Sequence, residues 1–175
     1  MASLVLLIML LFSFPAAAQF SEPEEFYRVD TRGPERIFQN GFSAWGSNSD
    51  LVAHASGAGC TQQISAADRS SAFIAMTSRR SFAEDYAQQL SQENNRAYIY
   101  RIRPNQNIYE LAESLEQLTH ASTELRRAAA WQEEWIAYRN IPRSDISRVE
   151  IYEGGRQIDV RSNPHYVRQA PLRKY

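Results

Sequence analysis

Short strand-like segments at irregular intervals limit what this chain can fold into. Each is rich in apolar, aromatic or β-branched residues and ends near Gly, Pro or a polar turn, which is typical of a β-strand. They lie at Phe26–Asp30, at residues 72–76, 97–103 and 131–138, and in a hairpin over 149–160. The segments between them do not alternate regularly between strand and helix. The pattern therefore predicts an α+β fold rather than a doubly wound sheet.

Three helices are expected between these strands. Pro34 can begin a short helix, and Asn40-Gly41 supplies the left-handed residue that ends one. Ser81 and Glu84 have the spacing of a capping box, which predicts a helix from Ser81 onward. The apolar residues of that helix recur at helical spacing as Phe82, Tyr86 and Leu90. A third, amphipathic helix is predicted by the spacing of Ile108, Leu111, Leu115 and Leu118.

Two of the strands place polar side chains on a shared face. Because side chains alternate along a strand, Arg28 and Asp30 point the same way. By the same rule the strand over 131–138 places Gln132 with Glu134 on one face and Glu133 on the other.

The N-terminal residues have the form of a signal peptide. Residues 4–14 are almost entirely apolar and lead to Pro15 and three alanines, which fits an h-region with cleavage after Ala18. No Lys or Arg precedes Leu4, and a membrane anchor is the alternative interpretation of this run. We expect a signal peptide over 1–18 and a single secreted domain over 19–175 with no membrane span after cleavage.

Charge and cysteine usage exclude some classes of protein. With 19 Lys and Arg against 20 Asp and Glu, the formal net charge is -1, so nucleic acid is not an expected partner. Cys60 is the only cysteine, so an internal disulfide is excluded. It is either a buried thiol or paired with a cysteine on another chain or on a segment outside this sequence.

The sequence lacks the motifs of several common classes of enzyme. The sequence contains no phosphate-cradling Gly-Lys-Ser/Thr loop, no dinucleotide Gly-rich turn and no His-Glu-x-x-His helix. The three histidines are far apart, so we expect metal-free chemistry. What remains is Arg28 on one strand, the hydroxyls of Thr77 and Ser78 at the end of another, and the pair Gln132 and Glu134. Taken singly, such residues are usually ion-paired, capping or solvated.

Taken together and in order, these residues resemble a known family. The segments 27–30, 38–46, 72–80, 98–100, 132–134 and 141–142, together with His54 and Cys60, are similar to the catalytic subunit of the pertussis toxin family of mono-ADP-ribosyltransferases. The similarity runs from about Phe26 to about Tyr166, and the block over 38–46 is its longest and most specific part.

The resemblance implies a fold, a substrate and a reaction. The fold is a split, mixed β-sheet sandwich with short flanking helices. The substrate is NAD+, with no metal, and the bond between nicotinamide and ribose breaks through an oxocarbenium-like transition state. ADP-ribose then passes to a protein of a target cell.

The resemblance also implies residue roles. Glu134 would hold the nicotinamide ribose and offset its developing positive charge. Arg28, beside Asp30, would bind the NAD phosphates, and Thr77 or Ser78 would hold Glu134 in place. His54 would assist the acceptor. Aromatic residues near NAD would be Trp45, Phe82 and Tyr86, each of which composition alone would place in the core.

Two departures from the family pattern leave alternatives open. Ala75 and Met76 stand where the family has hydroxyl residues, so Thr77 alone can supply a hydroxyl there. A secreted NAD glycohydrolase would use the same residues, and a catalytically inactive binding or decoy relative would tolerate the lost hydroxyl. The family's toxins also carry a C-terminal extension that completes a disulfide with the cysteine matching Cys60 and docks on a pentameric binding subunit. This sequence ends soon after Tyr166, so a separate delivery subunit stays a candidate partner, and the sequence leaves docking on such a pentamer open.

The side chain of Gln132 indicates which type of residue accepts the ADP-ribose. In related enzymes a glutamate at this position goes with arginine acceptors, because a carboxylate pairs with a guanidinium. A neutral amide instead suits a non-arginine acceptor such as cysteine or asparagine.

Overall fold

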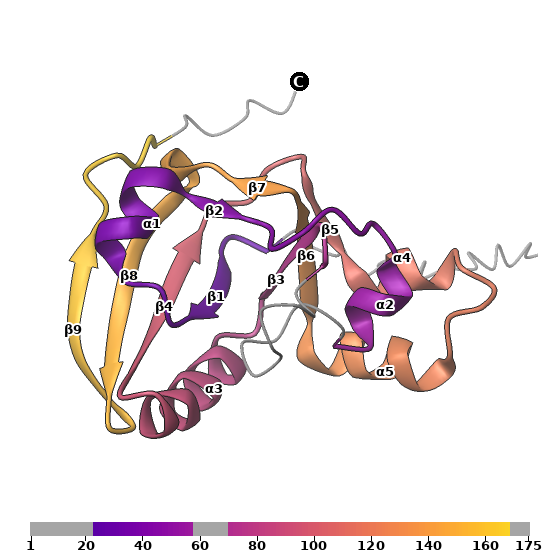
Figure 1. Ribbon diagram of the computed structural model, residues 1–175, viewed down its shortest axis with the longest axis horizontal. Coiled ribbons are helices and arrows are strands. Elements are labelled where there is room, and N and C mark those ends of the chain that lie inside the picture. The colour runs from indigo at the N-terminus through magenta and orange to yellow at the C-terminus, as the bar shows by residue number, and fades with distance from the viewer. Residues whose placement is uncertain (1–22, 58–69, 169–175) are drawn as a thin grey trace, which may run out of the picture.

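The computed structural model describes residues 23–57 and 70–168 of the 175. Cys60, the predicted signal peptide and its cleavage site lie outside these ranges. The α+β class is confirmed, with short helices around a large sheet (Figure 1). The elements are β1 (Phe26–Asp30), α1 (Pro34–Asn40), β2 (Phe42–Ser43), α2 (Leu51–Ala55), β3 (Phe73–Thr77), α3 (Arg80–Glu93), β4 (Arg96–Ile102), β5 (Ile108–Glu110), α4 (Leu111–Glu116), α5 (Thr123–Gln132), β6 (Glu134–Tyr138), β7 (Asn140–Ile141), the 3-10 helix η2 (Arg143–Asp145), β8 (Ile146–Glu153) and β9 (Arg156–Ser162).

Seven strands form one sheet in the order β5-β6-β3-β1-β4-β8-β9, and β2 pairs with β7 in a second sheet. All pairs between these strands are antiparallel. The expectation of a mixed sheet is therefore wrong in this detail. Within the described residues, parallel pairing is confined to the isolated bridge between Asn48 and Ser71.

The large sheet is split between β1 and β3. These two strands share one paired position, Tyr27 with Thr77, whereas β1 and β4 share five pairs and β3 and β6 share five. Figure 1 shows the consequence, since β1, β4, β8 and β9 lie to one side and β3, β5 and β6 to the other. The predicted split in the sheet is present, and it opens at the centre of the molecule.

The helices cover the two halves separately. Ala83, Ala87 and Leu90 of α3 are buried against Ile99 of β4 and Tyr152 of β8. The helices α2, α4 and α5 group beside the other half (Figure 1), where Leu111 and Leu115 are fully buried with Ile136 of β6. Each half of the sheet thus has its own apolar support, and the split between them stays open.

The largest sequence-based error concerns residues 131–138. The chain is helical through Gln132, Glu133 adopts a left-handed conformation with φ 46°, and the strand begins only at Glu134. The Ser122 side chain accepts a hydrogen bond from the Leu125 N–H and begins this helix, which the sequence analysis did not predict. The run of alanines before Trp131 favours its continuation.

Two predicted helices have different beginnings from those expected. The capping box at Ser81 is wrong, because α3 begins at Arg80 without a side-chain cap and Glu84 accepts from Arg80 Nε at 2.7 Å instead. The predicted helix over 108–118 is also shorter than expected. Ile108 lies in β5, and α4 begins at Leu111.

Other local predictions are confirmed. Pro34 is the first residue of α1, and Gly41 ends it with φ 72°. The C-terminal hairpin turns at Gly154 and Gly155, whose φ angles of 56° and 81° suit the two-residue turns that match strand twist. In the described part of the chain, no helix combines the length and the apolar character that a membrane crossing needs.

A buried carboxylate joins α3 to the sheet. Glu150 of β8 is 2% exposed, and it accepts from Arg101 Nε of β4 at 2.8 Å and from Arg80 Nη2 of α3 at 3.1 Å. A buried charge needs such partners, because burying it alone is costly. This group therefore fixes where α3, which carries part of the pocket described below, sits against the sheet.

We predict that Glu150→Gln lowers the free energy of unfolding by about 3 kcal/mol, because it leaves two arginines facing a neutral amide in a buried site. The matched control is Glu153→Gln on the same strand, where the carboxylate and its partner Arg96 are both exposed. It should cost less than about 1 kcal/mol. Urea unfolding of both variants measures the difference, and equal losses would contradict the prediction.

Candidate active site

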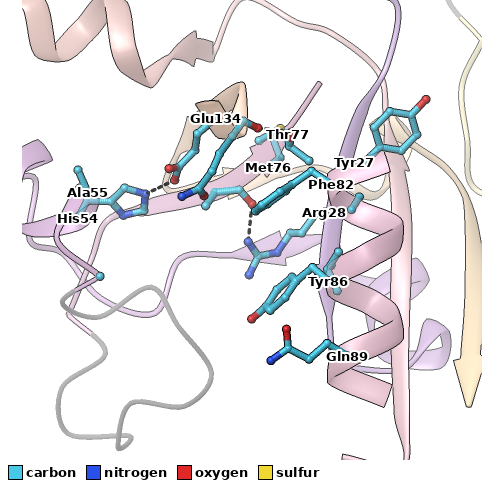
Figure 2. Close-up of a pocket in the computed structure, with 15 residues that line it drawn as sticks. Tyr27, Arg28, His54, Ala55, Met76, Thr77, Phe82, Tyr86, Gln89 and Glu134 are labelled. Atoms are coloured by element: carbon cyan, nitrogen blue, oxygen red, sulfur yellow. Dashed lines mark hydrogen bonds and ion pairs between the residues drawn. The ribbon is translucent and has the colours of Figure 1, made fainter. Parts of the chain in front are cut away.

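A pocket of about 440 Å³ occupies the split between β1 and β3. Its volume lies within the usual range for small-molecule sites. Figure 2 shows side chains from the two strands, from α3 and from α2 converging on it. Its lining residues are Tyr27, Arg28, Val29, His54, Ala55, Gly57, Ala75, Met76, Thr77, Phe82, Ala83, Tyr86, Gln89, Gln132 and Glu134.

Arg28 bridges the split in the sheet. Its Nη1 donates to the Ala75 carbonyl of β3 at 2.6 Å, so a side chain makes a contact that backbone pairing would make elsewhere in the sheet. Its Nε donates to Asp30 Oδ2 at 3.1 Å. The residue is 7% exposed, and its guanidinium lies in the pocket (Figure 2). A cation is thereby fixed at the floor of the pocket.

Asp30 holds the Arg28 guanidinium in place. Its side chain is fully buried and also accepts from Arg32 Nε at 2.9 Å and Arg32 Nη2 at 2.7 Å. Burial by itself raises the pKa of Asp30, but the hydrogen bonds from Arg32 and the charges of Arg28 and Arg32 outweigh it and hold the pKa below its ordinary value. Two guanidiniums share one carboxylate, so the group retains one net positive charge beside the pocket.

Glu134 lies on the opposite side of the pocket from Arg28, at the first position of β6. The left-handed Glu133 turns the chain sharply between α5 and β6. As a result Gln132 and Glu134 line the pocket, whereas Glu133 is exposed and does not. Strand alternation predicted that Gln132 and Glu134 share a face. The grouping is present, but a helix end followed by a tight corner produces it.

The end of β3 holds this corner in place. Thr77 pairs with Glu134 in the ladder, and its hydroxyl donates to the Gln132 carbonyl at 2.6 Å. Ser78 Oγ donates to Glu133 Oε2 at 2.7 Å, and the Ser78 N–H donates to the Glu133 carbonyl at 3.1 Å. The two hydroxyls thus bind the main chain and the neighbour of Glu134, rather than the Glu134 carboxylate itself. Ser78 does not line the pocket.

His54 enters the pocket from α2. Its side chain is fully buried, with Nε2 at 3.6 Å from Glu134 Oε1 and Nδ1 at 2.7 Å from Ser71 Oγ (Figure 2). Asp50 begins this short helix by accepting from the N–H groups of Val52 and Ala53. His54 was predicted as a site residue but Ser71 was not, since a serine 17 residues away in a polar stretch carries no local signal.

Two of the three predicted aromatic residues line the pocket, and the third does not. Phe82 and Tyr86 line the pocket from α3 (Figure 2). Trp45 does not line it. Its ring lies instead 4.5 Å from the Arg32 guanidinium carbon, so it contacts the charged group behind the pocket. Trp131, which was not predicted as a site residue, is 63% exposed and packs edge-to-face on Phe82.

The arrangement suits a ligand with separated charges. A fixed guanidinium at one side can bind a phosphate group, and a half-buried carboxylate at the other can stabilise positive charge. The aromatic rings that line the same pocket can contact planar groups. Over residues 23–57 and 70–168, we find no cluster of three or more His, Cys, Asp or Glu side chains placed to hold a metal ion.

Comparisons with known proteins agree with this arrangement. Residues 22–163 match the family model described as pertussis toxin, subunit 1. Pertussis toxin subunit 1 of Bordetella pertussis is 34% identical over 170 aligned residues, which cover 84% of this chain and 62% of the relative. The chain thus spans less than two thirds of that protein's length. The ADP-ribosylating toxin CARDS of Mycoplasma pneumoniae is 33% identical over 94 residues, or 53% of this chain and 15% of the toxin.

Solved structures have the same fold. The structure of EcPltA superposes with a TM-score of 0.71 at 28% identity, covering 85% of this chain and 90% of that one. Full-length CARDS toxin superposes with a TM-score of 0.65 at 23% identity, covering 87% of this chain and 30% of the toxin.

We predict that Asp30 makes stability depend on pH below about pH 4. Because the folded-state pKa lies below the unfolded one, the unfolded chain binds more protons as the pH falls, and stability is lost in that window. Asp30→Asn should lower stability at neutral pH and flatten its fall as the pH drops below about 4. Urea unfolding at several pH values measures both effects.

The control is Asp85→Asn, which removes an exposed carboxylate from α3. It should leave the slope of stability against pH unchanged. A slope in Asp30→Asn as steep as that of the wild type would contradict the role given to the buried carboxylate.

Proposed function

This chain belongs to the pertussis toxin subunit 1 family, and we propose that it is a secreted mono-ADP-ribosyltransferase that uses NAD+ and modifies a protein of a target cell. One observation carries the proposal. Glu134 and Arg28 come from the two halves of the split sheet and line a single pocket, together with two aromatic side chains of α3. The relative named ADP-ribosylating toxin CARDS supports the same reaction class.

The reaction requires a carboxylate near the ribose. The bond between the ribose C1′ and the nicotinamide nitrogen breaks, and its electron pair leaves with nicotinamide. Positive charge then develops on the ribose. The Glu134 carboxylate, whose side chain is 16% exposed, stabilises this charge more strongly than a fully solvated group would. The acceptor attacks C1′ and gives up its proton to water as the new bond forms.

Arg28 is assigned to the phosphates of NAD+. Its forked donors suit phosphate oxygens, and the net positive charge that Arg28, Arg32 and Asp30 share complements a pyrophosphate. The buried Asp30 keeps the guanidinium oriented, so little side-chain entropy is lost when the ligand binds. Phe82 and Tyr86 are assigned to the planar groups of NAD+.

Thr77 and Gln132 are assigned to the corner that carries Glu134. Thr77 holds it through the Gln132 carbonyl, which leaves the Gln132 side chain directed at the pocket. Ala75, where the resemblance leads us to expect a hydroxyl, contributes its carbonyl to Arg28. Because a main-chain carbonyl makes this contact, it does not depend on the side chain at position 75, and its presence favours an active enzyme over a decoy.

A secreted NAD glycohydrolase is the second candidate, because water in place of a protein acceptor would use the same pocket. Incubating residues 19–175 with labelled NAD+ and a target-cell lysate separates the two. Labelled protein supports the transferase, and nicotinamide release without labelled protein supports the glycohydrolase. Secretion through residues 1–18 and delivery by a separate subunit stay proposals, which N-terminal sequencing of exported protein and co-purification test.

We predict that Glu134→Gln lowers nicotinamide release about a hundredfold or more, because the charge that stabilises the transition state is lost. Glu133→Gln is the matched control, since Glu133 is exposed and bonded to Ser78 outside the pocket. It should cost less than about threefold. Steady-state rates for both variants test the assignment, and the reverse ranking would show that Glu133 is the catalytic carboxylate.

We predict an acceptor other than arginine. Gln132 offers a neutral amide to the acceptor, and an amide attracts a guanidinium much less than a carboxylate does. Mass spectrometry of the labelled target locates the ADP-ribose, which should lie on a residue such as cysteine or asparagine. Gln132→Glu should shift residual activity toward small guanidino compounds. ADP-ribose found on arginine with the wild-type enzyme would contradict this assignment.

A further inference from the structure

Ser71 occupies a fixed position immediately before β3. It is 2% exposed, and its carbonyl accepts from the Gly46 N–H at 3.0 Å. The next residue, Ala72, donates its N–H to the Asn48 carbonyl at 2.7 Å. The Ser71 side chain is therefore held by backbone contacts on both sides.

The Ser71 hydroxyl is positioned to donate its proton to His54. Its Oγ accepts from the Phe73 N–H at 3.1 Å and lies 2.7 Å from His54 Nδ1. An Oγ with two lone pairs could also accept from Nδ1–H, so this contact by itself permits either tautomer of a neutral imidazole. When the hydroxyl donates, Nδ1 is the acceptor of the ring and the ring proton resides on Nε2.

The other side of the ring selects the arrangement in which Nε2 carries the proton. His54 Nε2 lies 3.6 Å from Glu134 Oε1, and a lone pair on Nε2 would face a carboxylate. That arrangement is repulsive, whereas an N–H there is attractive. When His54 gains a second proton, Nδ1–H donates to Ser71 Oγ and Nε2 keeps its proton. In both protonation states an N–H faces Glu134.

We propose that Ser71 is a positioning residue that fixes the His54 tautomer, and that His54 in turn orients the Glu134 carboxylate rather than taking a proton from the acceptor. The resemblance to the toxin family implies instead that His54 assists the acceptor. A nitrogen that carries a proton and faces a carboxylate is a donor, so it is not placed to act as a base. This inference rests on the proposed function only where activity is measured.

The 3.6 Å separation exceeds an ordinary hydrogen bond, and the two side chains differ in how freely they can close it. His54 is fully buried, bonded to Ser71 and in contact with the Phe73 ring at 5.5 Å between centroids. Glu134 is 16% exposed and borders the open pocket. Glu134 is therefore the group that moves, and active-site contacts commonly tighten when substrate binds.

The first test is spectroscopic and needs no activity. Nitrogen-15 NMR of imidazole-labelled protein at about pH 8.5, where an ordinary imidazole is neutral, reports the tautomer of each histidine. The His54 signals are assigned by their loss in His54→Gln. We expect the Nε2–H tautomer in the wild type and a mixture of tautomers in Ser71→Ala. An Nδ1–H tautomer in the wild type, or an unchanged tautomer in Ser71→Ala, overturns the proposal.

The second test compares replacements that keep different nitrogens. A glutamine amide can reach the position of Nε2 and donate to Glu134, whereas an asparagine amide reaches only the position of Nδ1. His54→Gln should retain a kcat for nicotinamide release at least about tenfold above that of His54→Asn. Equal losses in the two variants would indicate a base rather than a donor and would overturn the proposal.

Ser71 is tested with a matched buried serine. Ser71→Ala should lower kcat about tenfold with little change in the KM for NAD+, and Ser71→Thr, which keeps the hydroxyl, should restore most of it. Ser91→Ala is the control, because Ser91 is 1% exposed and hydrogen-bonded to Gly155 outside the pocket. Equal losses in the two alanine variants would overturn the positioning role. If the wild type releases no nicotinamide, the proposed function fails while the NMR result still decides the tautomer.

Discussion

The single paired position between β1 and β3 is the constraint on which the pocket depends. A sheet paired along its full length would leave no room at its centre, because neighbouring strands lie about 5 Å apart. Here each half of the sheet is closed by its own helices, with α3 on one side and α2, α4 and α5 on the other (Figure 1). Unpaired backbone at the split would be costly if buried. Arg28 reduces that cost by donating to the Ala75 carbonyl across the gap, and the same contact places a cation in the pocket.

Buried charge fixes the geometry on both sides of the split. Asp30 holds Arg28 and Arg32, and Glu150 holds Arg80 and Arg101 between α3 and the sheet. Opposite them, the left-handed Glu133 brings the end of α5 and the start of β6 to one corner, which the hydroxyls of β3 secure. Both halves of the sheet that border the pocket are therefore held in place by buried contacts. Glu134 is more exposed than its neighbour His54.

The sequence predicted the parts of the fold that depend on neighbouring residues. Alternation and turn residues indicate strands such as Phe26–Asp30 and the hairpin at Gly154. The corner at Glu133 was missed because a left-handed glutamate has no local signal, and alternation over 131–138 resembled a strand. Contacts between distant positions, such as Arg28 with Ala75 or His54 with Ser71, depend on how the halves assemble. Resemblance to a family, not pattern, supplied the roles of the site residues.

The most direct test of the account is calorimetric titration of NAD+ into residues 19–175 carrying Glu134→Gln, which keeps the pocket but slows consumption of the ligand. The account predicts saturable binding of one NAD+ per chain. Adding Arg28→Lys should weaken that binding about tenfold or more, because lysine keeps the charge but loses the fork that meets Asp30 and phosphate together. No binding to the first variant, or equal affinity in both, would contradict the claim that the split sheet forms an NAD+ site around Arg28.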